Sequence, residues 1–362
     1  MNGLVLGFIM GLGQRAKGPE APAWRAAFEV HAMVNRLVST EDRATLNGNR
    51  AKLASVFVPG NPGAQKVYQK ALQRMAYLHQ WSLARQITWD GVRVSVATGQ
   101  PKWQGPAQVE VSGADQAAYQ YHHLVGNGDE NEFGMGVYHR YVLRRVGPTW
   151  YILDDQFIDP LNQDTRLSKA ALPALVRVRP ERRPTKPMNR GAEQAIRYAQ
   201  SFCGAAPGCR HNHRYHPAFR DYNGNGGDCT NFISQILHAG GFRESKTWSG
   251  SGDGTPAWVN AVLLGRYLTQ SSHAVIYARG RLPSLIAAPA NGRSALDRLR
   301  LGDLIGYEEH GCLAHFAVVV GFDSDGYPLV ISHSADRYRV PWDLGWDHST
   351  QYVFFHVRYP DR

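Results

Sequence analysis

The stretch GGDCTNFISQILHAGG, residues 226–241, places one cysteine where a glycine-rich loop turns into a helix. Apolar residues recur in it at helical spacing and two glycines end the run, which predicts a short buried helix over 230–238. Cys229 would then lie at the helix N-terminus, where unpaired N–H groups favour a thiolate and can hold a developing oxyanion. This position suits a nucleophile. The alternative is a buried thiol that only packs.

Two histidines downstream are the candidate partners of this thiol. A thiol nucleophile needs an imidazole that takes and returns its proton, and the imidazole needs an acceptor that orients it. His315 begins one apolar strand and His333 ends the next, with an Asp-Ser-Asp-Gly turn between them. A hairpin would bring the two rings within hydrogen-bonding range. Ser332 and Asp336 are close enough in sequence to compete with His333 as the orienting acceptor.

These motifs resemble a known family. The series DCTNFISQ (228–235), GDLI (302–305), His315 before an apolar strand, and SHS (332–334) resembles the bacterial putative amidase domain. That family belongs to the papain-like clan and is similar to the NlpC-type cell-wall cysteine peptidases. The resemblance covers about residues 192–360. It implies a papain-like hydrolase that uses a cysteine to cleave an amide or peptide bond, with bacterial cell-wall peptide (peptidoglycan) as the expected substrate.

The resemblance also implies roles for individual residues. Cys229 matches the nucleophile, His315 the general base, and His333 the polar residue that orients the imidazole. The backbone N–H of Cys229 would supply one oxyanion donor. No metal and no cofactor is expected.

Substrate-binding residues are expected on both sides of the cysteine. By the same resemblance, Asp228 and Thr230 would contact the substrate, although Asp228 is equally suited to cap the helix through its carboxylate. Tyr222 or Asn223 in the preceding loop would supply a second oxyanion donor, so Tyr222 is included among the substrate-binding candidates.

The first part of the chain predicts a smaller α+β domain over 20–165. Apolar residues recur at helical spacing in 24–38 and 64–85, and segments that alternate apolar and polar residues follow between 92 and 157. Helices followed by a curved antiparallel sheet resemble the cone-shaped fold of nuclear-transport-factor-like and cystatin-like domains. The chain is therefore predicted to be α+β, with the papain-like domain over 191–362.

Composition and charge narrow the class of protein and of partner. A chain with 43% hydrophobic and 19% charged residues is globular rather than disordered. Its formal net charge of +10 favours polyanionic surroundings, such as an anionic wall polymer. Prolines mixed with arginines and lysines predict an extended basic linker over 166–190. Since no nucleic-acid motif accompanies this segment, we expect a solvated tether and no specific nucleic-acid partner.

Cysteine usage and the N-terminal stretch bear on the compartment. Cys203 and Cys209 would close a small disulfide loop or, with the histidines that follow between 211 and 216, bind zinc, although the spacing matches no usual zinc pattern. The apolar run 3–13 is too short for a membrane span and resembles an imperfect signal-peptide core. We expect a secreted or cell-envelope protein with no transmembrane segment.

Two rival functions are kept. The first is a non-catalytic module that binds a peptide or glycan on the same fold, in which Cys229 is an ordinary thiol. The second is a basic protein that binds nucleic acid or membrane surfaces through its linker, with binding that falls steeply as salt rises.

Overall fold

The computed structural model describes residues 23–125, 128–161, 188–211, 214–287, 292–346 and 349–361. We call residues 23–161 the first half and residues 188–361 the second half. The apolar run 3–13 and nearly all of the predicted linker 166–190 lie outside the described residues.

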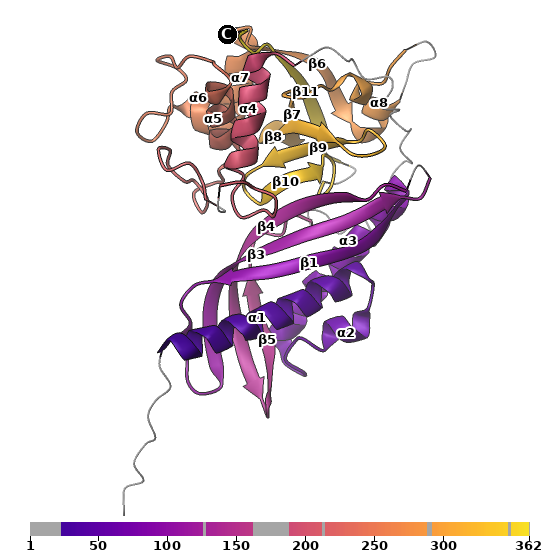
Figure 1. Ribbon diagram of the computed structural model, residues 1–362, viewed down its shortest axis with the longest axis vertical. Coiled ribbons are helices and arrows are strands. Elements are labelled where there is room, and N and C mark those ends of the chain that lie inside the picture. Colours follow the sequence, from indigo (N-terminus) through magenta and orange to yellow (C-terminus); the bar gives the residue numbers. More distant parts are fainter. Residues whose placement is uncertain are drawn as a thin grey trace, which may run out of the picture.

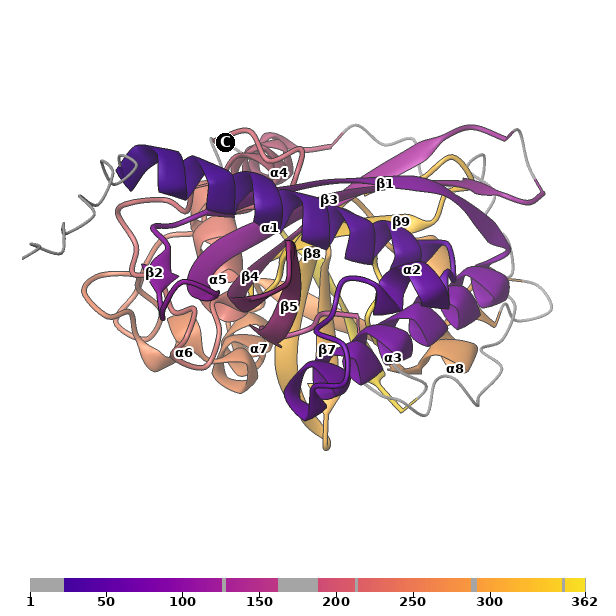
Figure 2. The same cartoon turned by 90° about the horizontal axis from the view of Figure 1, so that it is seen from below.

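The first half consists of helices followed by an antiparallel sheet. Two long helices, α1 and α3, cover one face of this sheet (Figure 2). Apolar residues such as Val34 on α1 and Val67 on α3 are buried against Val111 on β3. The elements are α1 (Ala23–Leu46), α2 (Arg50–Ala54), α3 (Pro62–Arg85), β1 (Ile87–Thr98), β2 (Lys102–Trp103), β3 (Gln108–His123), β4 (Asn131–Val146) and β5 (Thr149–Gln156).

The second half places helices against further antiparallel strands (Figure 1). The predicted helix over 230–238 is confirmed as α5. The elements are α4 (Arg190–Ser201), α5 (Cys229–Ala239), α6 (Pro256–Val259), α7 (Ala261–Gln270), β6 (Ala274–Arg281), α8 (Leu282–Ile286), the 3-10 helix η3 (Leu296–Arg298), β7 (Leu304–Glu309), β8 (Cys312–Phe322), β9 (Pro328–Ser332), β10 (Asp336–Pro341) and β11 (Gln351–Val357).

One sheet runs through both halves. Its strand order is β1-β3-β4-β10-β9-β8-β7-β11-β6, with β2 paired to β3 and β5 paired to β4. The halves meet where β10 pairs with β4, with Asp336 opposite Gly136. Helices combined with an antiparallel sheet confirm the predicted α+β class.

Two glycines on β4 allow this junction to close. Gly134 and Gly136 face the loop that follows α4, and a Cβ on Gly136 would lie 2.6 Å from the carbonyl carbon of Ala205. Only residues without a side chain leave room for a backbone so close. The junction therefore rests on direct backbone packing.

The predicted hairpin of β8 and β9 is confirmed and is buried on both faces. On one face, Phe316 and Ile331 pack with α5 residues such as Phe232. On the other face, Val319 and Val330 join an apolar cluster that also contains residues of the first half. Burial on both sides explains why these strands read as almost continuous apolar runs.

Among the described residues, none of the helices combines the length and the apolar character needed to cross a membrane.

Candidate active site

Asp228 organises the start of α5. It occupies the N-cap position, but its carboxylate makes no capping hydrogen bond. Oδ1 instead accepts hydrogen bonds from the backbone N–H of Tyr222, at 3.0 Å, and from the amide of Asn231, at 2.8 Å. Oδ2 lies 2.6 Å from Nδ1 of His333. Asp228 therefore ties the loop before α5, the first turn of α5 and the end of β9 to one buried carboxylate.

The hydroxyl of Ser334 takes the place of a helix cap. Its Oγ accepts hydrogen bonds from the backbone N–H groups of Asp228, at 2.5 Å, and Cys229, at 3.2 Å. N–H groups at a helix start have no partner inside the helix, so an outside oxygen stabilises them. The N–H expected to serve as an oxyanion donor is therefore bonded to Ser334 in this structure.

Cys229 is buried at the first position of α5, with 7% of its surface exposed. Its Sγ lies 3.8 Å from the hydroxyl oxygen of Thr230 and 4.0 Å from the carbonyl oxygen of Ala314. Burial raises the pKa of the Cys229 thiol, while hydrogen bonds from the Thr230 hydroxyl and the backbone N–H groups of Phe316 and Thr230 lower it. The neutral thiol is thus favoured, with donors in place for a thiolate.

His315 lies on β8 between the two residues whose backbones contact the sulfur. Its ring packs near Tyr307 and Trp346, at centroid distances of 5.5 and 5.4 Å. Burial, followed by the positive charges of Arg337 and His333, lowers the pKa of His315 to about 3. The imidazole is therefore neutral, and in these surroundings it is a weaker base than an imidazole in water. Within the described residues, no hydrogen bond joins the His315 ring to the Cys229 thiol.

His333 is fixed on all sides. Nδ1 faces Asp228, and Nε2 lies 2.6 Å from the backbone carbonyl oxygen of Phe202. The carbonyl only accepts, so Nε2 donates to it, while Nδ1 faces a carboxylate oxygen of Asp228. It is stacked between Phe232 and Tyr215, at centroid distances of 3.6 and 4.1 Å. With both nitrogens bonded elsewhere, His333 makes no hydrogen bond to His315.

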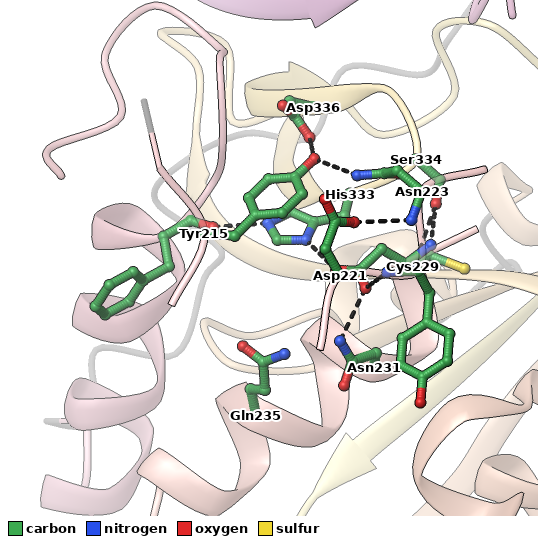
Figure 3. A network of polar contacts seen from close by, with 12 residues as sticks. Tyr215, Asp221, Asn223, Cys229, Asn231, Gln235, His333, Ser334 and Asp336 are labelled. Atoms are coloured by element: carbon green, nitrogen blue, oxygen red, sulfur yellow. Dashed lines mark hydrogen bonds and ion pairs between the residues drawn. The ribbon is translucent and has the colours of Figure 1, made fainter. Parts of the chain in front are cut away.

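Asp336 anchors a second group of polar contacts above His333 (Figure 3). Its Oδ1 accepts a hydrogen bond from the hydroxyl of Tyr215, at 2.5 Å, and Oδ2 accepts from the backbone N–H of Ala205, at 2.7 Å. The amide of Asn223 donates to the same tyrosine hydroxyl, at 2.7 Å. Burial raises the pKa of Asp336 to about 6, against the positive charge of His333.

The other two substrate-binding candidates, Thr230 and Tyr222, have side chains that contact different parts of the structure. The hydroxyl of Thr230 contacts the sulfur, whereas the hydroxyl of Tyr222 donates to the backbone carbonyl of Asp253. The Tyr222 ring also lies under the guanidinium of Arg220, 5.2 Å from its centroid. Thr230 is therefore adjacent to the thiol, and the Tyr222 side chain is held to a neighbouring loop.

Cys203 and Cys209 are joined in a disulfide, so neither sulfur is free to bind zinc. In the part of the chain that the structure describes, no group of three or more His, Cys, Asp or Glu residues is arranged to hold a metal ion. The disulfide closes the loop that carries the Ala205 N–H used by Asp336 and that follows the Phe202 carbonyl used by His333.

The family match concerns the second half of the chain. Residues 189–356 match the family model described as the putative amidase domain. The uncharacterized protein YhbB of Bacillus subtilis (strain 168) is 28% identical over 176 residues, which are 45% of this chain and 49% of that protein. The chain thus spans about half the length of this curated relative.

A solved structure also aligns with part of the chain. The crystal structure of the intermembrane space region of the chloroplast protein ARC6 aligns with 39% of this chain and 98% of its own, with a TM-score of 0.25 and 11% sequence identity. The family match instead covers α5 and the strands that carry or precede both histidines. It supports an amidase-domain family, and with it a hydrolase, for the second half of the chain.

Proposed function

We propose that the second half is a papain-like domain that hydrolyses an amide or peptide bond with Cys229 as its nucleophile. The observation that carries this proposal is the position of the sulfur, at the start of α5 and against the backbone on both sides of His315. A thiol at a helix N-terminus beside a strand that carries a neutral imidazole has the components of nucleophilic catalysis. The family match supports the same reaction class.

In the proposed reaction, His315 takes the proton of Cys229 as the sulfur attacks the amide carbonyl carbon. The C–N bond then breaks, and the amine leaves with the proton from His315. Water, deprotonated by His315, hydrolyses the thioester and regenerates the thiol. Because the His315 ring packs near Tyr307 and Trp346, the proposed reaction requires it to turn towards the sulfur when substrate binds.

The developing oxyanion requires donors near the first turn of α5. We propose that the Cys229 N–H serves once its bond to Ser334 is exchanged for one to substrate, with Asn223 or Tyr222 as the second donor. The double hydrogen bonding of His333 supports a positioning role, in which it holds the Asp228 carboxylate and the start of α5 in place. Asp228 and Thr230 remain our candidates for substrate contact.

Turnover of amide substrates tests this proposal. A panel of peptide amides, including peptides released from bacterial cell wall, is incubated with the full chain and products are identified by mass spectrometry. We expect cleavage that is lost in Cys229→Ala and retained in Cys312→Ala, because Cys312 is an exposed free thiol outside this arrangement. Cleavage that survives in Cys229→Ala would refute the nucleophile.

A binding module on the same fold is the second candidate. The buried, neutral thiol of Cys229 favours this candidate, because within the described residues the thiol makes no hydrogen bond to the His315 ring. In that case peptide or glycan binding, measured by calorimetry, persists unchanged in Cys229→Ala and no member of the panel is cleaved.

We propose residues 20–165 as an accessory α+β domain of the cystatin-like or nuclear-transport-factor-like type, joined by 166–190 to the hydrolase domain over 191–362. Cell-wall peptide as substrate and an anionic wall polymer as partner belong to the same proposal. A disulfide in the second half favours a secreted or envelope location, since disulfides persist in oxidising compartments.

A further inference from the structure

A small basic pocket lies at the end of the sheet. It encloses about 180 Å³ and is lined by Val275, Tyr277, Arg293, Arg298, Arg300 and His356. Strands β7 and β11 separate β6, which carries two of these residues, from β8, which the Cys229 sulfur contacts. The pocket is therefore distinct from the candidate active site. Its volume is below the roughly 300–1,000 Å³ of pockets for drug-sized molecules, so it suits a small chemical group.

The lining carries three guanidinium groups and no carboxylate. The nearby buried Asp303 does not pair with them. Its Oδ1 accepts from Nδ1 of His356, at 2.9 Å, and its Oδ2 accepts from the backbone N–H of Arg300, at 2.9 Å. Asp303 thus fixes the wall of the pocket and leaves the positive charge of the arginine side chains facing solvent.

Two of the arginine side chains are already oriented. Nη1 of Arg300 lies 3.2 Å from Nε2 of His356, which accepts the hydrogen bond because Nδ1 of that ring donates to Asp303. The guanidinium of Arg298 lies over the Tyr277 ring, 4.9 Å from its centroid. Such stacking leaves the in-plane N–H groups free to bind an anion. Groups that are held in place before binding lose less entropy when a ligand arrives.

We propose that this pocket binds a phosphate group. A phosphomonoester carries about −1.5 to −2 charge and three strong acceptor oxygens, whereas a carboxylate, like a phosphodiester, carries one charge on two such oxygens. Guanidinium forks match phosphate oxygens in pairs, and three of them around one small pocket exceed what a single carboxylate can engage. The charge and the number of oxygens favour a phosphomonoester, and a phosphodiester of an anionic polymer is the other source that the test distinguishes.

Calorimetric titration of the full chain tests the proposal. Inorganic phosphate, glycerol 3-phosphate, dimethyl phosphate and acetate are titrated separately at one ionic strength set with sodium chloride, because simple charge attraction is screened by salt. We expect inorganic phosphate and glycerol 3-phosphate to bind, and acetate to bind at least about tenfold more weakly. Stronger binding of glycerol 3-phosphate indicates a terminal phosphate, whereas equal binding of dimethyl phosphate indicates a phosphodiester.

Substitutions locate the site. Arg298→Ala and Arg300→Ala should each weaken phosphate binding about tenfold, the effect of one lost charged hydrogen bond. Arg298→Lys keeps the charge but loses the planar guanidinium, so its affinity for phosphate should lie between those of Arg298→Ala and the native protein. Arg243 is another exposed arginine, on the loop after α5, and Arg243→Ala should bind phosphate as the native protein does. Circular dichroism checks folding, and if Arg300→Ala unfolds, the two Arg298 variants decide.

The proposal is overturned if phosphate does not bind, if acetate binds equally well, or if Arg243→Ala weakens binding as much as Arg298→Ala. None of these outcomes involves Cys229, so they leave the proposed hydrolase untouched. Loss of turnover in Cys229→Ala likewise does not affect phosphate binding.

Discussion

The hydroxyl of Ser334 links the start of α5 to the turn after β9. Asp228, at the N-cap, has its carboxylate engaged with His333, Tyr222 and Asn231, so the helix depends on an oxygen from another element. Ser334 provides that oxygen from a left-handed backbone conformation, with φ of 66°. Ser334 therefore both caps the helix and accepts the hydrogen bond of the Cys229 N–H.

We expect Ser334→Ala to lower the free energy of unfolding by about 1 kcal/mol, as loss of an N-cap does. Urea denaturation followed by circular dichroism measures the change. Ser271→Ala is the control, because the hydroxyl of Ser271 donates to a carbonyl on its own helix. An equal effect of both substitutions would show that Ser334 does not cap α5.

Among the elements, β4 and β10 join the two halves through glycine. The pairing sets Asp336 opposite Gly136, and the same Asp336 accepts from Ala205 in the loop that crosses β4. The junction between the halves thus lies at Asp336, three positions after His333 in the sequence. Any side chain on β4 at this point must displace that loop.

Gly136→Ala should destabilise the protein by about 1–3 kcal/mol, because the added methyl group would lie 2.6 Å from the Ala205 carbonyl carbon. Gly91→Ala on β1 is the matched control, since nothing lies within 4 Å of its added Cβ. Thermal unfolding of both variants measures the difference. Equal melting temperatures would mean that the loop moves away from β4 at little cost.

The Cys203–Cys209 disulfide holds the loop that bears on both His333 and Asp336. Reduction should destabilise the protein by about 2 kcal/mol, since the unfolded chain regains conformational freedom. Urea denaturation with and without dithiothreitol measures this. The variant with both cysteines changed to serine should be insensitive to the reductant, and a native protein equally insensitive would contradict the prediction.

Elements with a strong local pattern were predictable from the sequence. The spacing of Phe232, Ile233 and Ile236 indicates α5, and the continuous apolar runs around a turn indicate the β8–β9 hairpin. The polar contacts were harder to predict. Tyr215 reaches Asp336 over 121 positions of sequence, and nothing in the local pattern of either residue indicates the other. Ser334 lies inside a recognised motif, but its role as a cap requires the spatial approach of β9 to α5.

The orientation of the two histidine rings could not be predicted from the sequence either. The hairpin places His315 and His333 on adjacent strands, but ring contacts depend on the face each side chain takes. Apolar neighbours of His315 belong to the cluster shared with the first half, whereas His333 stacks on Phe232 of α5. The hairpin pattern alone does not predict which face of the sheet His315 takes, because a β-bulge just before His315 interrupts the alternation of side chains.

At the scale of the whole molecule, buried polar contacts join the two halves. Arg85 on α3 donates from Nε to Asp343 at 2.9 Å, across 258 positions of sequence, and Tyr121 on β3 donates to Asp323 at 3.0 Å. Both pairs are buried. Together with the shared sheet, they tie the first half to the β8–β9 turn and to the segment that follows β10.

The first half contains a buried group of acids that makes stability depend on pH. Burial, followed by the charge of Asp42, raises the pKa of Asp115, and burial also raises the pKa of Glu41. Burial raises the pKa of Asp42 as well, against the positive charge of Arg74. Arg74 faces the group from α3, 3.7 Å from Asp42.

For these acids the folded pKa lies above the unfolded value, so their contribution to stability is present below the unfolded pKa, near 4, and is lost as pH rises through the folded pKa. We expect the free energy of unfolding to fall as pH rises from about 4 through the neutral range. Urea denaturation at a series of pH values measures the slope. Asp115→Asn should flatten it, and an unchanged slope in that variant would place the dependence elsewhere.

The most direct test of the central claim is formation of a thioester on Cys229. The full chain is mixed with p-nitrophenyl acetate, quenched in acid, and mapped by mass spectrometry at successive times. The account predicts an acetyl group on Cys229 that forms and is then hydrolysed, with formation slowed about a hundredfold or more in His315→Ala. Acetylation of Cys229 at equal rates in both proteins, or none at that residue, would contradict the assignment of Cys229 and His315 as nucleophile and base.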